Sequence, residues 1–179
     1  MSHFALTIIG RDRPGIVSQV TEILYQQGFN IADSSCSILG GQFSMILIIS
    51  HPQMAAKEDF EQAFSPLEES HLSVFIRTLK PGGEISPELT GELCMISVYG
   101  ADKPGIVFRV AHTLGQRDIN ITDLNTKLIG KVDNPVYVMM LEAVLPEGTE
   151  METVEGWMTE LKNELQVDIT VRELTPMEL

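Results

Sequence analysis

Large apolar residues occupy every second position in the first part of the chain, and apolar residues then recur with a helical period. The alternating positions, which predict a strand with one buried face, are Phe4, Leu6 and Ile8. The helical stripe, which predicts a helix packed along one side, consists of Ile16, Val20, Ile23 and Leu24. Gly28 is expected to end this helix.

Two β-rich runs, Ile31 to Leu39 and Gln42 to Ser50, follow the helix and predict a hairpin with a tight turn at Gly40 and Gly41. A last strand is predicted at Leu72 to Leu79. Between them, a second helix is indicated by Phe60, Ala63, Phe64 and Leu67. We expect Pro66 to end or kink that helix early.

The same pattern occurs a second time. The segment Gly10-Arg11-Asp12-Arg13-Pro14-Gly15-Ile16-Val17 matches Gly100-Ala101-Asp102-Lys103-Pro104-Gly105-Ile106-Val107, a shift of 90 residues, and the register holds as far as Gly130. The second copy adds a longer predicted turn from Gly130 to Pro135, then a strand at Val136 to Val144. It closes with a helix marked by Met151, Val154, Met158, Leu161 and Leu165, and a strand at Val167 to Leu174.

These elements predict two domains, residues 1–80 and 92–179, joined by a linker at 81–91 that is rich in Pro and Gly. The order βαββαβ in each predicts a four-stranded antiparallel sheet with two helices on one face. The predicted fold class is therefore α+β, with two tandem ferredoxin-like modules.

Charge and cysteine content narrow the classes of function. Acidic residues outnumber basic ones 25 to 12, for a net charge of −13, so the surface disfavours direct binding to nucleic acid. The start of the chain lacks the pattern of a signal peptide, and no apolar run approaches the roughly 20 residues that span a bilayer, so we expect no membrane association. The 2 cysteines fit a reducing, cytoplasmic setting.

The junction between the first strand and the first helix is the candidate site in each copy. Pro14 presets φ for the opening turn, Gly15 allows close backbone approach, and the Asp12 side chain can accept hydrogen bonds from the first helix amides. Free amides at a helix start favour a carboxylate, and a nearby Asp or Asn can take an ammonium group. Asn30 can bring its amide to a ligand at this junction or at an interface between modules. A zwitterionic amino acid fits that pairing.

Structural explanations remain open beside these functional ones. The Pro-Gly junction can serve only to start a helix, and Asn30 and Asn120 can be turn residues that satisfy local backbone groups. Cys94 aligns with Phe4 and is expected to be a buried small hydrophobe. Four histidines lie on different elements without metal-ligand spacing, so no metal and no cofactor is predicted. Asp118 replaces Gly28, which is expected to strain or change the end of the helix.

The run Asp-Arg-Pro-Gly-Ile-Val, followed by Gly-Phe-Asn-Ile-Ala-Asp-Ser, resembles the ACT domain, and its tandem use resembles the glycine cleavage system transcriptional repressor group. The resemblance covers both modules and implies amino-acid-responsive regulation, dimers, action through protein partners, and ligands held where the first helix and loop of one module face a strand of another. The ligand-facing positions that it implies are Asp12, Pro14, Gly15, Asn30, Ile31, Asp102, Pro104, Gly105, Asn120 and Ile121.

Three classes of function compete on these grounds. The leading hypothesis is a cytoplasmic sensor, not an enzyme, that binds a small amino acid such as glycine and controls transcription through a transcription-regulator protein. The second is a non-catalytic regulatory module or homologue of the ACT part of an amino-acid or formyltetrahydrofolate enzyme. The third is RNA binding, since βαββαβ is also the order of RNA-recognition modules. The third class needs exposed aromatics and a basic sheet, whereas aromatic residues are 6% of this acidic chain.

Overall fold

A computed structural model describes residues 1–80, 91–131 and 134–174, with the side chains of residues 131 and 134 left aside. Its contacts divide the chain into two compact units, Met1–Pro87 and Glu88–Leu179, and each is described by itself. Almost all of the predicted linker, residues 81–91, lies outside the described residues, so its extent stays a prediction.

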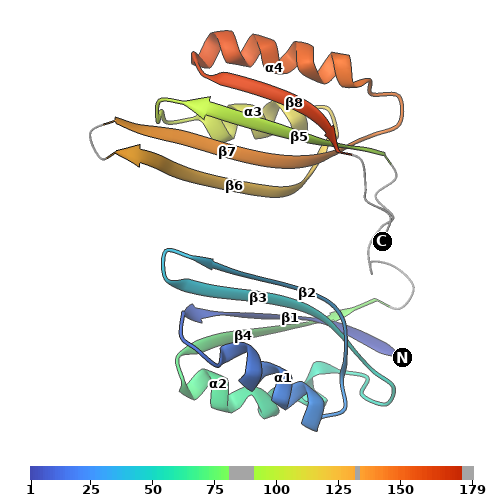
Figure 1. The fold of residues 1–179 in the computed structure, drawn as a ribbon. Coiled ribbons are helices and arrows are strands. Elements are labelled where there is room, and N and C mark those ends of the chain that lie inside the picture. The colour runs from blue at the N-terminus through green and yellow to red at the C-terminus, as the bar shows by residue number, and fades with distance from the viewer. Residues whose placement is uncertain (81–90, 132–133, 175–179) are drawn as a thin grey trace. The chain divides into compact units, whose positions relative to one another are not determined.

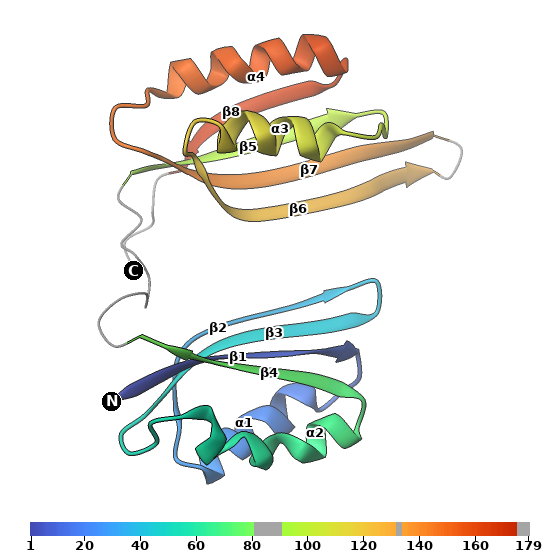
Figure 2. The same ribbon diagram turned by 180° about the vertical axis from the view of Figure 1, so that it is seen from behind.

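The first unit is a ferredoxin-like module (Figure 1). Its elements are β1 (Ser2–Arg11), α1 (Ile16–Gln26), β2 (Asn30–Leu39), β3 (Gln42–His51), the 3-10 turns η1 (Lys57–Asp59) and η2 (Glu61–Phe64), α2 (Ser65–Glu69) and β4 (Leu72–Leu79). The strands pair antiparallel in the order β2-β3-β1-β4. Both helices cover the same face of the sheet, as the views from two sides show (Figures 1 and 2).

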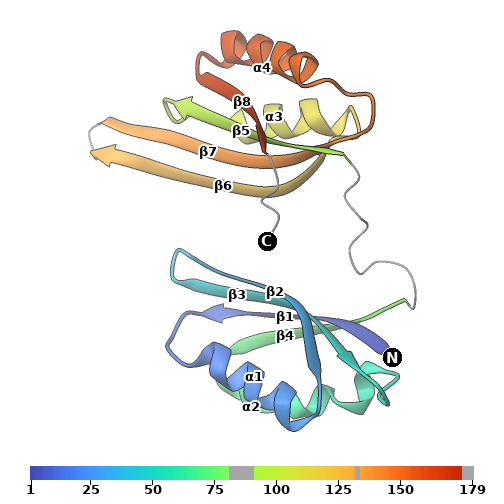
Figure 3. The same ribbon diagram turned by 45° about the vertical axis from the view of Figure 1, so that its right-hand side comes forward.

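The second unit repeats this topology. Its elements are β5 (Glu92–Gly100), α3 (Ile106–Gly115), β6 (Asn120–Lys131), β7 (Asn134–Leu145), α4 (Met151–Leu165) and β8 (Asp168–Leu174). The sheet order is β6-β7-β5-β8, again antiparallel, and α3 and α4 lie on one face (Figure 3). The predicted α+β class with two ferredoxin-like modules is confirmed.

The core of each module lies between the sheet and the helices, where the sequence periodicities placed it. Phe4, Leu6 and Ile8 of β1 are fully buried, and the α1 stripe meets them through Ile16, Val20 and Leu24. The equivalent core of the second module is built from Cys94, Ile96, Val98, Ile106, Val110 and Leu114.

The two cores differ in the size of their side chains. Phe4 packs edge-on against Phe60 with ring centroids 4.9 Å apart, and Phe29 lies 4.6 Å from Phe60, so the first module has an aromatic cluster. Cys94 stands where Phe4 does and is also buried, as predicted. The second module replaces the aromatic volume with the regular helix α4, which buries Val154, Met158 and Leu161.

Two local expectations were wrong, and a third was wrong in part. Pro66 does not end the second helix: it lies in the first turn of α2, where its missing N–H costs nothing, and the segment before it forms 3-10 turns. The longer turn is not found either, because Gly130 pairs with Pro135, so strand pairing continues to residues 131 and 134. The expectation at Asp118 was wrong only in part: the helix end is not changed, but Asp118 adopts the left-handed conformation, φ 55°, that Gly28 has at φ 77°, so the expected strain of a non-glycine residue is present.

No helix in residues 1–80, 91–131 and 134–174 is long and apolar enough to cross a bilayer.

The two cysteines should react at very different rates. Burial raises the pKa of the Cys94 thiol, so this side chain is both inaccessible and protonated near neutral pH, whereas Cys36 is exposed on β2. In Ellman titration at pH 8, we expect one thiol to react quickly and the second only after unfolding. Cys36→Ser should remove the fast phase, and a fast phase that survives in this variant would contradict the assignment.

Candidate functional site

The first candidate junction begins where β1 ends and is shaped by a left-handed glycine. Gly15 precedes α1 with φ 90° and ψ −2°, and Gly105 precedes α3 with φ 96° and ψ −6°. A Cβ at either position would meet nothing within 4 Å. Glycine is therefore required here by its backbone conformation, and the predicted close approach of another backbone is not made by atoms of the same module.

Asp12 does not cap the helix as expected. No side chain caps α1, and the Asp12 carboxylate is exposed. Its backbone N–H instead donates to the Gly41 carbonyl at 2.9 Å, which ties the junction to the β2–β3 turn. The first amides of a helix have no partner within it, so the junction presents donors and a carboxylate to a ligand.

A basic side chain that sequence reasoning missed fixes each junction to its second helix. Arg13 donates through Nη2 to the Gln19 Oε1 at 2.8 Å and to the Ser70 Oγ at 3.0 Å, beside the end of α2. Lys103, at the equivalent position, donates to the Leu165 carbonyl, the last of α4, at 3.1 Å. A cation is favoured at a helix C-terminus. The signal was a basic residue before Pro-Gly in both copies.

Asn30 lies at the other end of the sheet from the junction. Asn30 pairs with Ser50, which pairs with His3, whereas Arg11 pairs with Gln42 beside the junction. His3 and Arg11 are eight residues apart along β1, so the two places are separated by about 26 Å at the usual rise of a strand. One module alone therefore does not bring Asn30 and Ile31 to Asp12, Pro14 and Gly15.

The second module has the same separation. Asn120 pairs with Val144, which in turn pairs with Leu93 at the start of β5. Gly100 is at the other end of β5, and the junction residues Asp102, Pro104 and Gly105 follow it. Asn120 is exposed and Ile121 half-buried, while Ile31 is 38% exposed. A ligand that contacts both groups of predicted residues must lie between two modules.

The two junctions differ in the strand residues near the aspartate. Burial raises the pKa of Tyr137, the charge of Asp102 raises it further, and a hydrogen bond with Thr126 acts in the opposite direction. The register places Cys36 and Phe43 at the corresponding positions of the first hairpin. Asp102 therefore lies near a phenol, and the neighbourhood of Asp12 has no such group at that position.

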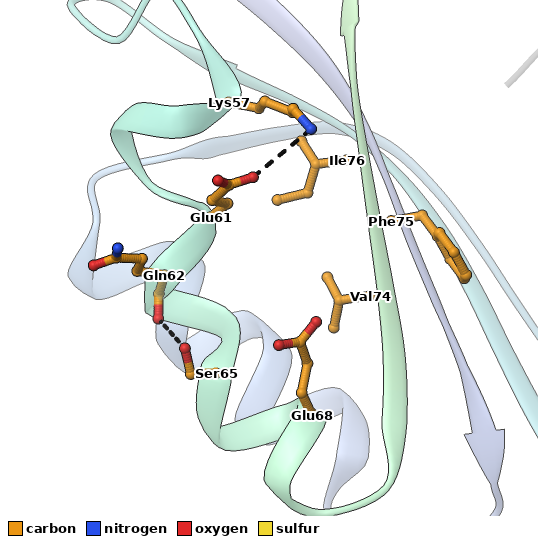
Figure 4. A pocket seen from close by; sticks show the side chains of 8 residues that line it. All are labelled: Lys57, Glu61, Gln62, Ser65, Glu68, Val74, Phe75 and Ile76. Atoms are coloured by element: carbon orange, nitrogen blue, oxygen red, sulfur yellow. Dashed lines mark hydrogen bonds and ion pairs between the residues drawn. The ribbon is translucent and has the colours of Figure 1, made fainter.

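A groove in the first module contains none of the predicted residues (Figure 4). It has a volume of about 400 Å³ and lies between β4 and the broken second helix. Several of its polar groups interact with one another. The Lys57 Nζ lies 3.8 Å from the Glu61 Oε2, and the Ser65 hydroxyl donates to the Gln62 carbonyl at 2.8 Å. Among the described residues, no group of three or more His, Cys, Asp and Glu side chains is placed to hold a metal ion.

Several known proteins resemble this chain in amino-acid sequence. The family model of the ACT domain matches residues 2–73, which cover the first module as far as the start of β4. The glycine cleavage system transcriptional repressor of Escherichia coli strain K12 is 27% identical over 122 residues, covering 68% of this chain and 63% of that protein. The UPF0237 protein of Methanococcus maripaludis is 34% identical over 68 residues, covering 38% of this chain and 73% of that protein.

A solved structure shares the whole fold. The crystal structure of an unknown protein from Galdieria sulphuraria has a TM-score of 0.81 with 24% identity, over 97% of this chain and 99% of that one. At this identity the likeness concerns the fold alone. The match to the Escherichia coli repressor spans somewhat under two thirds of that protein's length.

The left-handed glycine makes a measurable prediction about stability. Gly105→Ala should lower the free energy of unfolding of the second module by roughly 1–2 kcal/mol, because an L residue is strained at this φ. Trp157, the one tryptophan of the chain, lies on α4 and reports unfolding of this module by fluorescence during urea titration.

Gly115→Ala is the matched control in the same module. Gly115 is helical, and a Cβ there meets nothing within 4 Å, so this variant should keep or slightly raise the midpoint. Equal midpoints for Gly105→Ala and the unsubstituted protein would show that the glycine is not needed for its conformation.

Proposed function

This chain belongs to the ACT-domain family, and on that premise we propose that it is an amino-acid-responsive regulator that controls transcription through a protein partner. The observation that carries the proposal is the repeated junction, with Asp12 or Asp102 exposed beside a helix start that a left-handed glycine opens. Unpaired amides at that start favour the carboxylate of an amino acid, and the aspartate favours its ammonium group.

The ligand lies between two modules. Asp12 with Pro14 and Gly15 is at one end of its sheet and Asn30 with Ile31 at the other, so the junction of one module must be completed by the β2 edge of another. β2 is an edge strand and is exposed along its whole length. A ligand held in this way favours the associated arrangement of modules by its differential affinity, which is how its concentration becomes a signal. A homodimer is the simplest assembly with such a site.

The first module is the preferred ligand site. The family match lies on residues 2–73, and the neighbourhood of Asp12 lacks the phenol that lies near Asp102. Glycine is the first amino acid to test, because the related Escherichia coli protein is named as a repressor of the glycine cleavage system. The second module, with Asn120, Ile121 and its own junction, then serves mainly to hold the assembly.

The partner is a basic transcription regulator. With 25 acidic and 12 basic residues, this chain repels a phosphate backbone, so control of transcription passes through another protein. We assign no catalytic step: the Cys94 thiol is buried with a raised pKa, and Cys36 is a free thiol on an edge strand. Free thiols also fit the proposed cytoplasmic location.

Isothermal titration calorimetry against the common amino acids tests the ligand. We expect a small amino acid to bind, and Asp12→Asn or Asn30→Ala to weaken binding at least about tenfold, which is 1.4 kcal/mol. Glu58→Gln, at an exposed position outside the first junction, is the matched control and should bind normally. Failure of every common amino acid to bind the unsubstituted protein would refute the ligand proposal.

Mixing the two weak variants tests whether the site spans two copies. A mixed assembly contains junctions with Asp12 from one chain and Asn30 from the other, so mixing Asp12→Asn protein with Asn30→Ala protein should recover part of the binding enthalpy. No recovery after the subunits have exchanged would contradict a ligand site that combines Asp12 of one copy with Asn30 of another.

The partner proposal predicts weak contact with DNA. In electrophoretic mobility assays the purified protein alone should leave promoter DNA unshifted at physiological salt, because the net charge of −13 opposes binding. Affinity capture from its own cell extract should recover a DNA-binding regulator. Tight binding of promoter DNA by the purified protein would overturn action through a partner.

A further inference from the structure

Each sheet has one face covered by helices and an opposite face, here called the open face. In an antiparallel pair, directly opposed residues point to the same side. Because Cys94, Ile96 and Val98 are buried under the helices, the alternate residues of β5 lie on the open face. The first module shows the same division in Figure 4, where Phe75 points away from Val74 and Ile76, which face the helix side.

The open face of the second module carries charges at its four corners. Met95 is opposed by Arg172 on β8 and by Glu142 on β7, and Glu142 is opposed by Asp123 on β6. This row therefore runs from a cation at one edge strand to a carboxylate at the other. Four residues further along β5, the row of Tyr99 has the reverse order, with Asp168 on β8 and Lys127 on β6. Asp168 differs from the other three charged residues, because its carboxylate already forms an ion pair with Lys162 of α4 at 2.9 Å.

An apolar depression lies between these corners. It has a volume of about 460 Å³, and its apolar lining includes Met95, Tyr99, Val138 and Met140. Tyr99 and Met140 are each 42% exposed. The solvated face of an antiparallel sheet is ordinarily polar, so an apolar centre of this kind is typical of a binding surface.

One pair of charges on this face is unfavourable in the isolated module. Asp123 and Glu142 are directly opposed carboxylates, an arrangement that destabilises a sheet. Asn125 donates to Asp123 at 2.7 Å, and neither carboxylate joins an ion pair within the described part of the chain. A cation brought by another molecule would relieve the repulsion.

We propose that the open face of the second module packs against the same face of a second copy, about a two-fold axis parallel to the strands. This axis places β8 over β6 of the other copy and β5 over its β7. Arg172 then faces Asp123 of the partner subunit, and the two-fold axis repeats this pair at the other edge. Lys127 approaches Asp168 of the partner subunit, but Asp168 is already neutralised by Lys162 of its own module, so the Arg172–Asp123 pairs carry the interface. Facing sheets pack about 10 Å apart, a gap that long Arg and Lys side chains span at the rim while the apolar centres close on each other.

The first module is less suited to this packing. Its open face repeats one charged row, with Arg77 on β4 and Asp33 on β2. The row of Ile9, however, ends in Ser73 and Ser37, so two of the four corners are uncharged. In its charged row Ile48, not a carboxylate, opposes Asp33, so the first module has no like-charge pair there for a partner's cation to relieve. For this reason the interface is assigned to the second module.

Sedimentation velocity of the full chain over two orders of magnitude in concentration tests the interface. The unsubstituted protein should dimerise, and Arg172→Asp or Asp123→Arg should raise the dimer dissociation constant at least about tenfold, because each change acts twice in a two-fold interface. The double variant Arg172→Asp/Asp123→Arg exchanges the charges and should restore the dimer. Circular dichroism establishes that each variant is folded.

Arg77→Asp is the matched control, since it makes the same change in the corresponding row of the first module and should leave the dissociation constant unchanged. A monomer at every concentration, a double variant that fails to restore the dimer, or an equal loss in Arg77→Asp would each overturn the proposal. The inference rests on the self-association proposed above. Titration calorimetry of the same variants with amino acids measures ligand binding independently of dimerisation. A failure of the interface proposal can therefore be told from a failure of the ligand proposal.

Discussion

Burial of one side of the central strand β1, and of β5 in the second module, is the constraint on which the remaining structure depends. Phe4, Leu6 and Ile8 are fully shielded from solvent beneath the helices, and the α1 stripe of Ile16 and Val20 covers them. Once these faces match, the strand order and the positions of both ends of the sheet follow. The junction loop and the open face are consequences of that packing.

The direction of α1 then limits what one module can do alone. The helix starts at Gly15 beside one end of the sheet and returns the chain to the other end, where β2 begins at Asn30. Residues that resemble one ligand site are therefore far apart within a module. The proposed amino-acid site is therefore completed only by association of two modules, and this links the proposed site to the oligomeric state.

Duplication has preserved the junction more closely than its surroundings. Gly15 and Gly105 share one backbone conformation, and Arg13 and Lys103 both tie the junction to the end of the second helix. Around them, the aromatic cluster of Phe4 and Phe60 in the first core contrasts with Cys94 and a continuous α4 in the second. The copies thus keep the same entrance to the first helix over cores that are filled in different ways.

The sequence by itself determined the repeat, the core and most of the element types. Burial of one face imposes a period of 2 on a strand and of 3.6 on a helix, and residues such as Leu6 and Val20 show these periods locally. The sequence also located the junction, since a left-handed turn selects glycine at residues 15 and 105. Tertiary structure decided what depends on pairing register and packing between distant segments: the separation of Asp12 from Asn30, the role of Pro66 in opening α2, and the anchoring of Arg13 on Ser70. It also placed Arg172 and Asp123 in one row, because cross-strand register joins residues whose spacing along the chain carries no period.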